Sequence, residues 1–137
     1  MAAIAIVPIV LNDIDLKIAA DNYEASVSKV ELVPTTPTTV WRGMTPAANI
    51  PLAGTPVWAM NVSGAQDHAT ASSLSQYTQA NAGTVKTVTL KPKKGTTVPT
   101  YSIDVLILAT KIGGDVDAVA TFDATFPCQG QPVRTVA

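Results

Sequence analysis

The chain has 137 residues, of which 47% are hydrophobic and only 14% are charged, whereas an average soluble domain carries about 25% charged residues. A single cysteine excludes an internal disulfide, a single histidine excludes a multi-histidine metal site, and a net charge of −1 argues against binding to nucleic-acid phosphates. The length predicts one domain over residues 1–137. A compact 14.2 kDa monomer exposes roughly 6,800 Å² of surface, which so few charges cover thinly. We therefore expect part of the surface to be buried against other protein, in preference to a surface covered by Thr, Ser, Asn and Gln.

The first segment, residues 1–12, is apolar and is predicted to be an N-terminal arm that packs on something. It has no basic start, contains Pro8 and runs directly into Asn12 and Asp13, so it does not resemble a signal peptide. It is also too short to span a membrane.

Most of the chain alternates apolar and polar residues with a period of two, which predicts strands with one buried face. The alternating segments are 14–18, 29–32, 58–62, 87–90 and 121–126. Residues 101–110 differ, because Leu106, Ile107 and Leu108 are consecutive, and this predicts a strand covered on both faces. A hairpin turn is predicted at 112–115, where two glycines are adjacent. The fold class is therefore mainly β, a β-sandwich or rolled antiparallel sheet with one flanking α-helix.

The helix is predicted between residues 67 and 81. Asp67 or Thr70 provides the N-terminal cap, Asn81 ends the helical pattern and Gly83 supplies the C′ position.

Residues 44–55 read as a long loop with two prolines and no charged residue. Loops of this length without structure are usually functional or disordered. Because this one carries Met44, Pro46, Ile50 and Leu52, we expect it to dock onto a partner rather than to move freely.

The sequence offers little chemistry. Asp67 and His68 could join a serine in a catalytic triad, but adjacent residues seldom face one another and no G-x-S-x-G motif is present, so helix capping is the preferred role of Asp67. The acidic residues Asp115, Asp117 and Asp123 lack calcium-loop spacing and are expected to face solvent or a shared aqueous channel. We predict no enzyme activity, no cofactor and no metal.

Several segments together resemble the major tail tube proteins of long-tailed bacteriophages with flexible, non-contractile tails, especially those that infect actinobacteria. The resemblance covers roughly residues 14–132. It is carried by the order and spacing of TVWRG followed by TP, PVW, QD, LSQY, NAG, KP, IGG and the ending FDATFPCQGQP.

This resemblance implies a structural virion protein rather than an enzyme. Six copies would form a ring around a shared inner β-barrel, and rings would stack around a tape measure protein, with tail tip and terminator proteins as further partners. The tube would conduct DNA into the host without binding it specifically and without a membrane role. The protein would reside in the virion tail, and in the host cytoplasm before assembly.

The resemblance also suggests roles for particular residues. The segment with Met44, Pro46, Ile50 and Leu52 would be a ring-stacking element, and Asp104 and Asp123 would face the lumen, where negative charge repels DNA phosphates. Two other classes stay open. One is a carbohydrate-binding or adhesin-type β-sandwich, which needs exposed aromatic residues, whereas Trp41 and Trp58 are predicted to be core. The other is a small hydrolase, which lacks a nucleophile–base pair.

Overall fold

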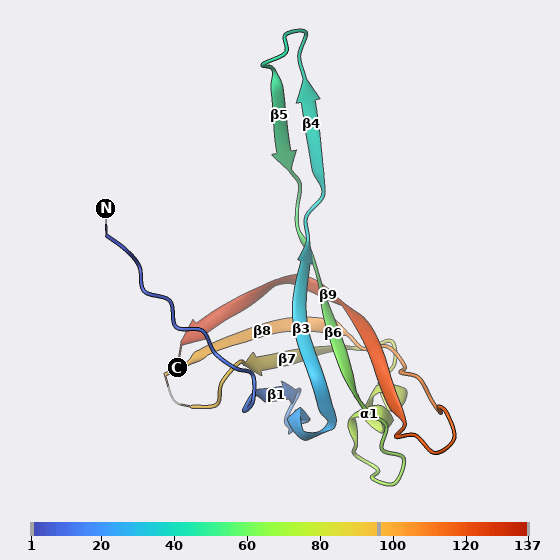
Figure 1. Cartoon of the computed structure of the whole chain (residues 1–137). Coiled ribbons are helices and arrows are strands. Elements are labelled where there is room, and N and C mark those ends of the chain that lie inside the picture. Colours follow the sequence, from blue (N-terminus) through green and yellow to red (C-terminus); the bar gives the residue numbers. More distant parts are fainter. Residues whose placement is uncertain (1, 96, 137) are drawn as a thin grey trace.

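The computed structural model describes residues 2–95 and 97–136 and has the predicted mainly β architecture. Two antiparallel sheets contain the strands, and one short helix flanks the larger sheet (Figure 1). In chain order the elements are β1 Asp15–Ile18, β2 Asp21–Asn22, the 3-10 turn Glu24–Ser26, β3 Val27–Thr35, β4 Thr38–Arg42, β5 Asn49–Ala53, β6 Val57–Ala65, α1 Leu74–Ala80, β7 Val85–Lys91, β8 Pro99–Leu106 and β9 Thr121–Val136.

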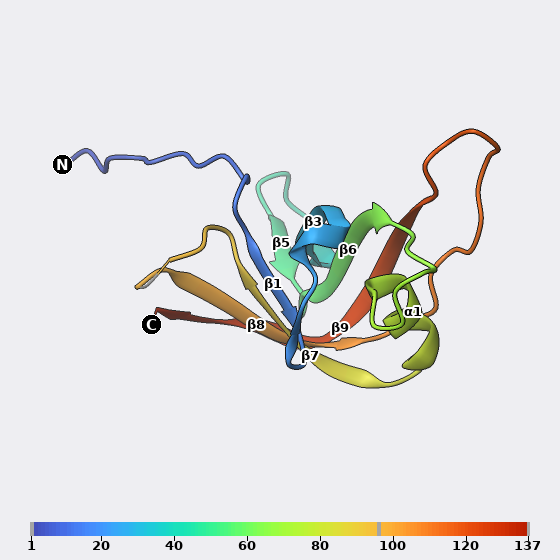
Figure 2. The same ribbon diagram turned by 90° about the horizontal axis from the view of Figure 1, so that it is seen from below.

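The larger sheet has seven strands in the order β2-β1-β7-β8-β9-β6-β3, and all neighbours are antiparallel. It rolls over itself, so that β3 and β6 lie across β1, β7 and β8 (Figures 1 and 2). Strands β2 and β3 are its two edges. The rolled antiparallel sheet with a flanking helix confirms the predicted fold class.

Strand β9 is the corner of the roll. Its first half pairs with β6 as far as Pro127, and its second half pairs with β8 from Cys128 onward. The β8–β9 register shifts between Ser102 and Asp104, where Gly130 adopts a φ of +75°. Glycine reaches this φ without steric cost, so the strand can bulge and bend here. One strand can therefore serve both layers.

The core fills the inside of the roll. Alternate residues of the paired strands point inward, as in the registers Leu16↔Leu90 and Met60↔Phe126. The buried apolar residues are Leu16, Ile18, Tyr23, Met60, Val62, Leu74, Val88, Ile103, Val105, Ile107, Phe122 and Phe126. Since these residues come from both layers and from α1, the core joins the helix to the rolled sheet.

The helix is shorter than predicted. It begins after Ser73, whose hydroxyl accepts a hydrogen bond from the backbone N–H of Gln76. Asp67 instead accepts hydrogen bonds from the backbone N–H groups of Ala69 and Thr70, so it caps the turn that precedes the helix. Gly83 lies beyond the C-cap residue Asn81 and donates its N–H to the carbonyl of Ile107, at 2.7 Å.

The apolar run at the end of β8 was misread as a doubly covered strand. The strand ends at Leu106, Ile107 is buried, and Leu108 is 40% exposed. The backbone of Ile107 still pairs with residues 83 and 84, which precede β7, and the chain leaves the sheet after Ile107. The hairpin predicted at 112–115 is also wrong. Residues 107–120 form one loop that carries the chain from the end of β8 to the start of β9 beside β6.

Candidate assembly surfaces

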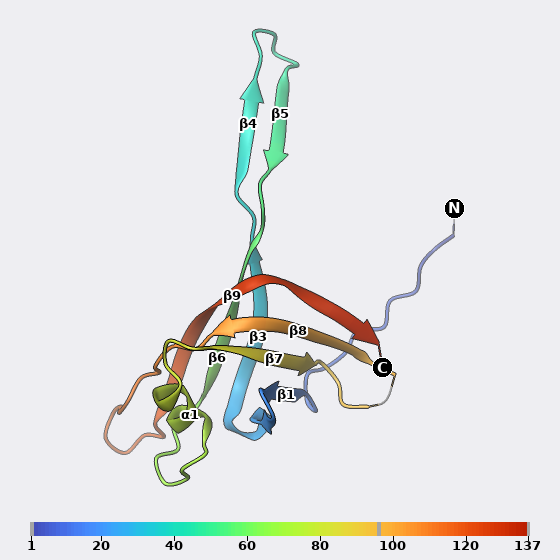
Figure 3. The ribbon, with the colours of Figure 1, turned by 180° about the vertical axis from the view of Figure 1, so that it is seen from behind.

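A β-hairpin projects from the domain and carries an exposed apolar face. Strands β4 and β5 pair from Thr38↔Ala53 to Arg42↔Asn49 and stand clear of the larger sheet (Figures 1 and 3). They extend the β3–β6 pair, because β4 follows β3 after two residues and β5 precedes β6 by three. The prediction of a structureless loop over 44–55 is therefore wrong for Asn49–Ala53, which is strand β5.

The predicted stacking residues divide between the two parts of the hairpin. Met44 and Pro46 lie in the exposed turn. The backbone N–H of Gly43 donates to the carbonyl of Ala48 and closes this turn. The register Trp41↔Ile50 and Thr39↔Leu52 places Ile50 and Leu52 on one face with Trp41. These three side chains are 52–64% exposed.

Trp41 corrects a sequence prediction, because it was assigned to the core and is 64% exposed. Every residue of β4 is exposed, because the hairpin has no second layer to bury either face. Trp58 is half-buried and packs against the core, as predicted.

The N-terminal arm is a second unpartnered apolar segment. Residues 2–11 form no strand or turn and run away from the domain (Figure 2). Its large side chains are 52–90% exposed: Ile4, Ile6, Val7, Ile9, Val10 and Leu11. The first residue of the predicted 1–12 arm lies outside the described residues. The chain exposes 9229 Å², well above the roughly 6,800 Å² expected for a compact monomer of this mass, because the arm, the hairpin and the 107–120 loop project from it.

The root of the arm is fixed to the domain. The backbone N–H of Lys94 donates to the carbonyl of Asp13 at 2.9 Å, and the Lys94 ammonium lies 3.2 Å from a Glu24 carboxylate oxygen. Burial acts to raise the pKa of Glu24, but hydrogen bonds from backbone N–H groups and from Lys94 outweigh it and hold the pKa below its ordinary value. The arm therefore leaves from a defined point.

The outer face of the rolled sheet is polar and brings the two predicted lumen residues onto one side. Asp104 on β8 pairs with Gln129 on β9. Asp123 lies on β9 six residues before Gln129, an even spacing that gives the two residues the same side of the strand. Both are exposed, and both accept a hydrogen bond across the sheet, Asp104 from Thr87 and Asp123 from Ser63.

Both signs of charge occur on this face. Lys29 stands opposite Ser63 and next to Glu31, whose carboxylate accepts a hydrogen bond from Asn61. That hydrogen bond, and then the Lys29 charge, keep the pKa of Glu31 below its ordinary value. The face is therefore hydrated and mixed in sign rather than uniformly negative.

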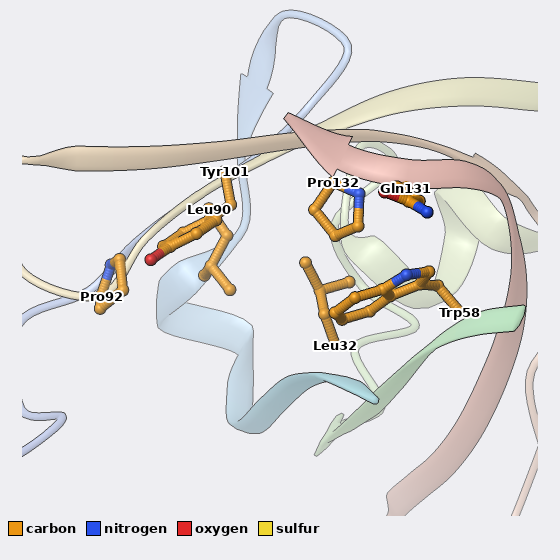
Figure 4. Close-up of a pocket in the computed structure, with 7 residues that line it drawn as sticks. All are labelled: Leu32, Trp58, Leu90, Pro92, Tyr101, Gln131 and Pro132. Carbon is orange, nitrogen blue, oxygen red and sulfur yellow. The ribbon is translucent and has the colours of Figure 1, made fainter. Parts of the chain in front are cut away.

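An apolar cleft of about 330 Å³ lies at the open end of the roll (Figure 4). Its lining residues come from both layers: Leu32, Trp58, Leu90, Pro92, Tyr101, Gln131 and Pro132. The indole N–H of Trp58 is buried without a hydrogen-bond partner among the described residues. A buried polar group left unpaired costs about 1–3 kcal/mol. Helix α1 lies at the other end of the roll (Figure 2), and the cleft is open to solvent in the described part of the chain.

Neither catalytic nor metal-binding groups are brought together in the described part of the chain. Residues 2–95 and 97–136 contain no group of three or more His, Cys, Asp or Glu placed to hold a metal. His68 contacts Gln66 and Gln76, not a serine. Across the same residues no helix has the length and apolar character needed to cross a membrane.

Comparison with known proteins finds a likeness only at the level of structure. No family model matches the chain, and no curated protein matches its sequence. Among solved structures, the chain is similar to the sheath/tube terminator of an extracellular contractile injection system, PVC, seen in its extended state by cryo-EM. The two chains are 11% identical, and the match covers 97% of this chain and 100% of that one with a TM-score of 0.69. At this identity the likeness shows a shared fold over the full length of both chains.

Proposed function

We propose that this protein is a structural subunit of a bacteriophage tail or a tail-like injection particle, and that hexameric rings of it stack into the tail tube. The observation that carries the proposal is the fold likeness, over 97% of this chain, to the sheath/tube terminator of a contractile injection system. The tube resemblance of segments between residues 14 and 132 points to the same class of particle. Its partners would be further copies of itself, a tape measure protein inside the tube and proteins at the tube's ends.

The exposed apolar surface supports self-assembly. Trp41, Ile50 and Leu52 share one face of a hairpin that projects from the domain, and the arm adds further unpartnered aliphatic side chains. Contiguous exposed apolar patches mark interaction sites. In the proposed tube, the hairpin contacts the next ring, with Met44 and Pro46 at its tip.

Sheet edges give a route to ring closure. Strands β2 and β3 are the edges of the seven-stranded sheet, and edge strands present unpaired backbone groups that can pair with another chain. A head-to-tail contact between edges closes into a ring when its rotation fits.

The polar outer face is the proposed lumen wall. In this arrangement Asp104 and Asp123 contact water in the channel, and DNA passes without a stable phosphate contact. Asp104→Lys together with Asp123→Lys should leave ring formation intact but slow DNA delivery by assembled particles, because the wall then attracts phosphates. An assembled structure with both side chains on the outside of the tube would overturn this assignment.

Sedimentation velocity and negative-stain microscopy of the purified full chain test the function. A tube subunit gives rings of about 85 kDa, six copies of the 14.2 kDa chain, and then stacks of rings. A monomer at all concentrations that binds glycans would instead establish the adhesin-type alternative, for which exposed Trp41 is the supporting observation.

A second candidate within the same class is a tube terminator. The similar solved structure, a sheath/tube terminator, favours this candidate. The same experiment separates the two, because a terminator forms single rings that do not stack on themselves.

A further inference from the structure

We infer that the apolar cleft at the open end of the roll receives the N-terminal arm, residues 4–11, of a second copy of this chain. The inference rests on the proposed function, since it names a contact that joins neighbouring subunits. It concerns a surface distinct from the hairpin.

The cleft is incomplete in a single chain. Leu32 and Trp58 form one wall, Leu90 and Tyr101 the facing wall, and the space between them is open (Figure 4). No lining residue is charged. The unpaired indole N–H of Trp58 requires an acceptor, which the backbone carbonyls of an extended peptide supply.

The arm matches this cleft in chemistry. Residues 2–11 contain no charged side chain and are almost entirely aliphatic. In an extended segment alternate side chains point to opposite sides, so Ile4, Ile6 and Val10 share one side. A cleft of about 330 Å³ has room for a few such side chains. Since these side chains are 79–90% exposed, the single chain leaves them without the cover that the cleft offers.

The geometry favours a second copy over the arm's own domain. The arm is anchored by the contact between Asp13 and Lys94, and Pro92 of the cleft lies two residues from Lys94. The cleft therefore lies beside the arm's root, and residues 4–7 reach their own cleft only if the arm reverses direction. Residues 2–11 contain no turn. Extended, ten residues span about 33–36 Å, which carries Ile4 and Ile6 beyond their own domain.

Disulfide mapping between copies tests the contact in the full chain. In a Cys128→Ser background, protein with Ile6→Cys is mixed with protein carrying Gln131→Cys, which places the second thiol at the cleft rim. The matched control replaces Gln131→Cys with Val119→Cys, an 80% exposed site on the 107–120 loop at the far end of the roll. We expect linked dimers with the cleft thiol and only background linkage with the loop thiol. Equal linkage of Ile6→Cys to the cleft thiol and to the loop thiol overturns the inference. It is also overturned if Leu52→Cys protein links to Gln131→Cys protein whereas Ile6→Cys protein does not.

A second measurement does not depend on assembly. Trp41→Phe leaves Trp58 as the only tryptophan. Ile6→Asp in the full chain introduces a charge that keeps the chain's own arm out of the apolar cleft. Adding a peptide of residues 2–11 should shift Trp58 emission to shorter wavelength and saturate, and Ile6→Asp in the peptide should weaken binding by about tenfold or more. If the wild-type chain associates through the arm but forms no rings, the proposed function fails and this contact stands. A wild-type chain that stays monomeric overturns both. If rings form while Trp58 emission does not respond, the contact fails and the proposed function stands.

Discussion

The β3–β6 pair and the β4–β5 hairpin are successive parts of the same two-stranded ribbon, yet their apolar residues have opposite environments. In the first part, Met60 and Val62 are almost completely buried under the facing layer. In the second, Trp41, Ile50 and Leu52 are more than half exposed. The strand geometry is the same in both parts, so the difference lies in what packs against the ribbon. The first part therefore stabilises the subunit, whereas the apolar face of the second is left uncovered, as the proposed contact between copies requires.

The largest expected effect on the subunit is in the buried part. Phe126→Ala removes a fully buried ring opposite Met60 and should lower the free energy of unfolding by about 3–5 kcal/mol. Urea denaturation followed by circular dichroism measures this. A loss below about 1 kcal/mol would show that the core of the roll is not where the subunit gains its stability.

The matching change in the hairpin should spare the subunit and break the assembly. Trp41→Asp is expected to change the free energy of unfolding by less than about 0.5 kcal/mol, because the side chain is exposed. It should weaken association by about 2 kcal/mol or more if Trp41 is a central anchor. Sedimentation velocity measures the second effect, and Val119→Asp, at an even more exposed apolar site outside the hairpin, is the control. Equal effects of the two variants would remove the distinction between the hairpin and other exposed apolar sites.

A smaller effect is expected at the start of α1. The Ser73 hydroxyl accepts a hydrogen bond from the backbone N–H of Gln76 and donates one to the carbonyl of Asp67. Ser73→Ala removes both hydrogen bonds and should lower the free energy of unfolding by about 1 kcal/mol. Ser73→Thr retains a capping hydroxyl and serves as the control. Thermal melts of the two variants compare them, and equal melting temperatures would show that the cap contributes nothing.

The smallest effect is a pH dependence at the turn before α1. The Thr70 hydroxyl, followed by the backbone N–H groups of Thr70 and Ala69, holds the pKa of Asp67 below its ordinary value of 3.8. The ionised form therefore stabilises the fold above about pH 4, and this stabilisation is lost as the pH falls through the lowered pKa. Asp67→Asn should reduce the dependence of stability on pH in the acid range, measured by urea denaturation at several pH values. An unchanged acid dependence would show that Asp67 does not contribute to it.

The alternating pattern predicted most of the rolled sheet. Segments at 14–18, 29–32, 58–62, 87–90 and 121–126 all lie in or overlap strands. Alternation reports that one face is apolar, and in these strands that face meets the core. The second half of β9 was missed, because residues 127–136 contain two prolines and a glycine at the bend and do not alternate cleanly.

The same pattern could not predict the environment of the hairpin. Trp41 is predicted to be core but is exposed in β4, and in residues 49–53 Pro51 conceals the strand. The signal that was available is the pairing of two short β-prone segments around Gly43 and residues 44–48. Whether their apolar face is covered depends on a second layer, which local sequence does not encode.

Cryo-EM of assemblies formed by the purified wild-type chain tests the central claim most directly. The account predicts closed rings that stack, with the Trp41, Ile50 and Leu52 face of the hairpin buried between rings. Rings or tubes in which this face remains in solvent, or a chain that stays monomeric at every concentration, would contradict it.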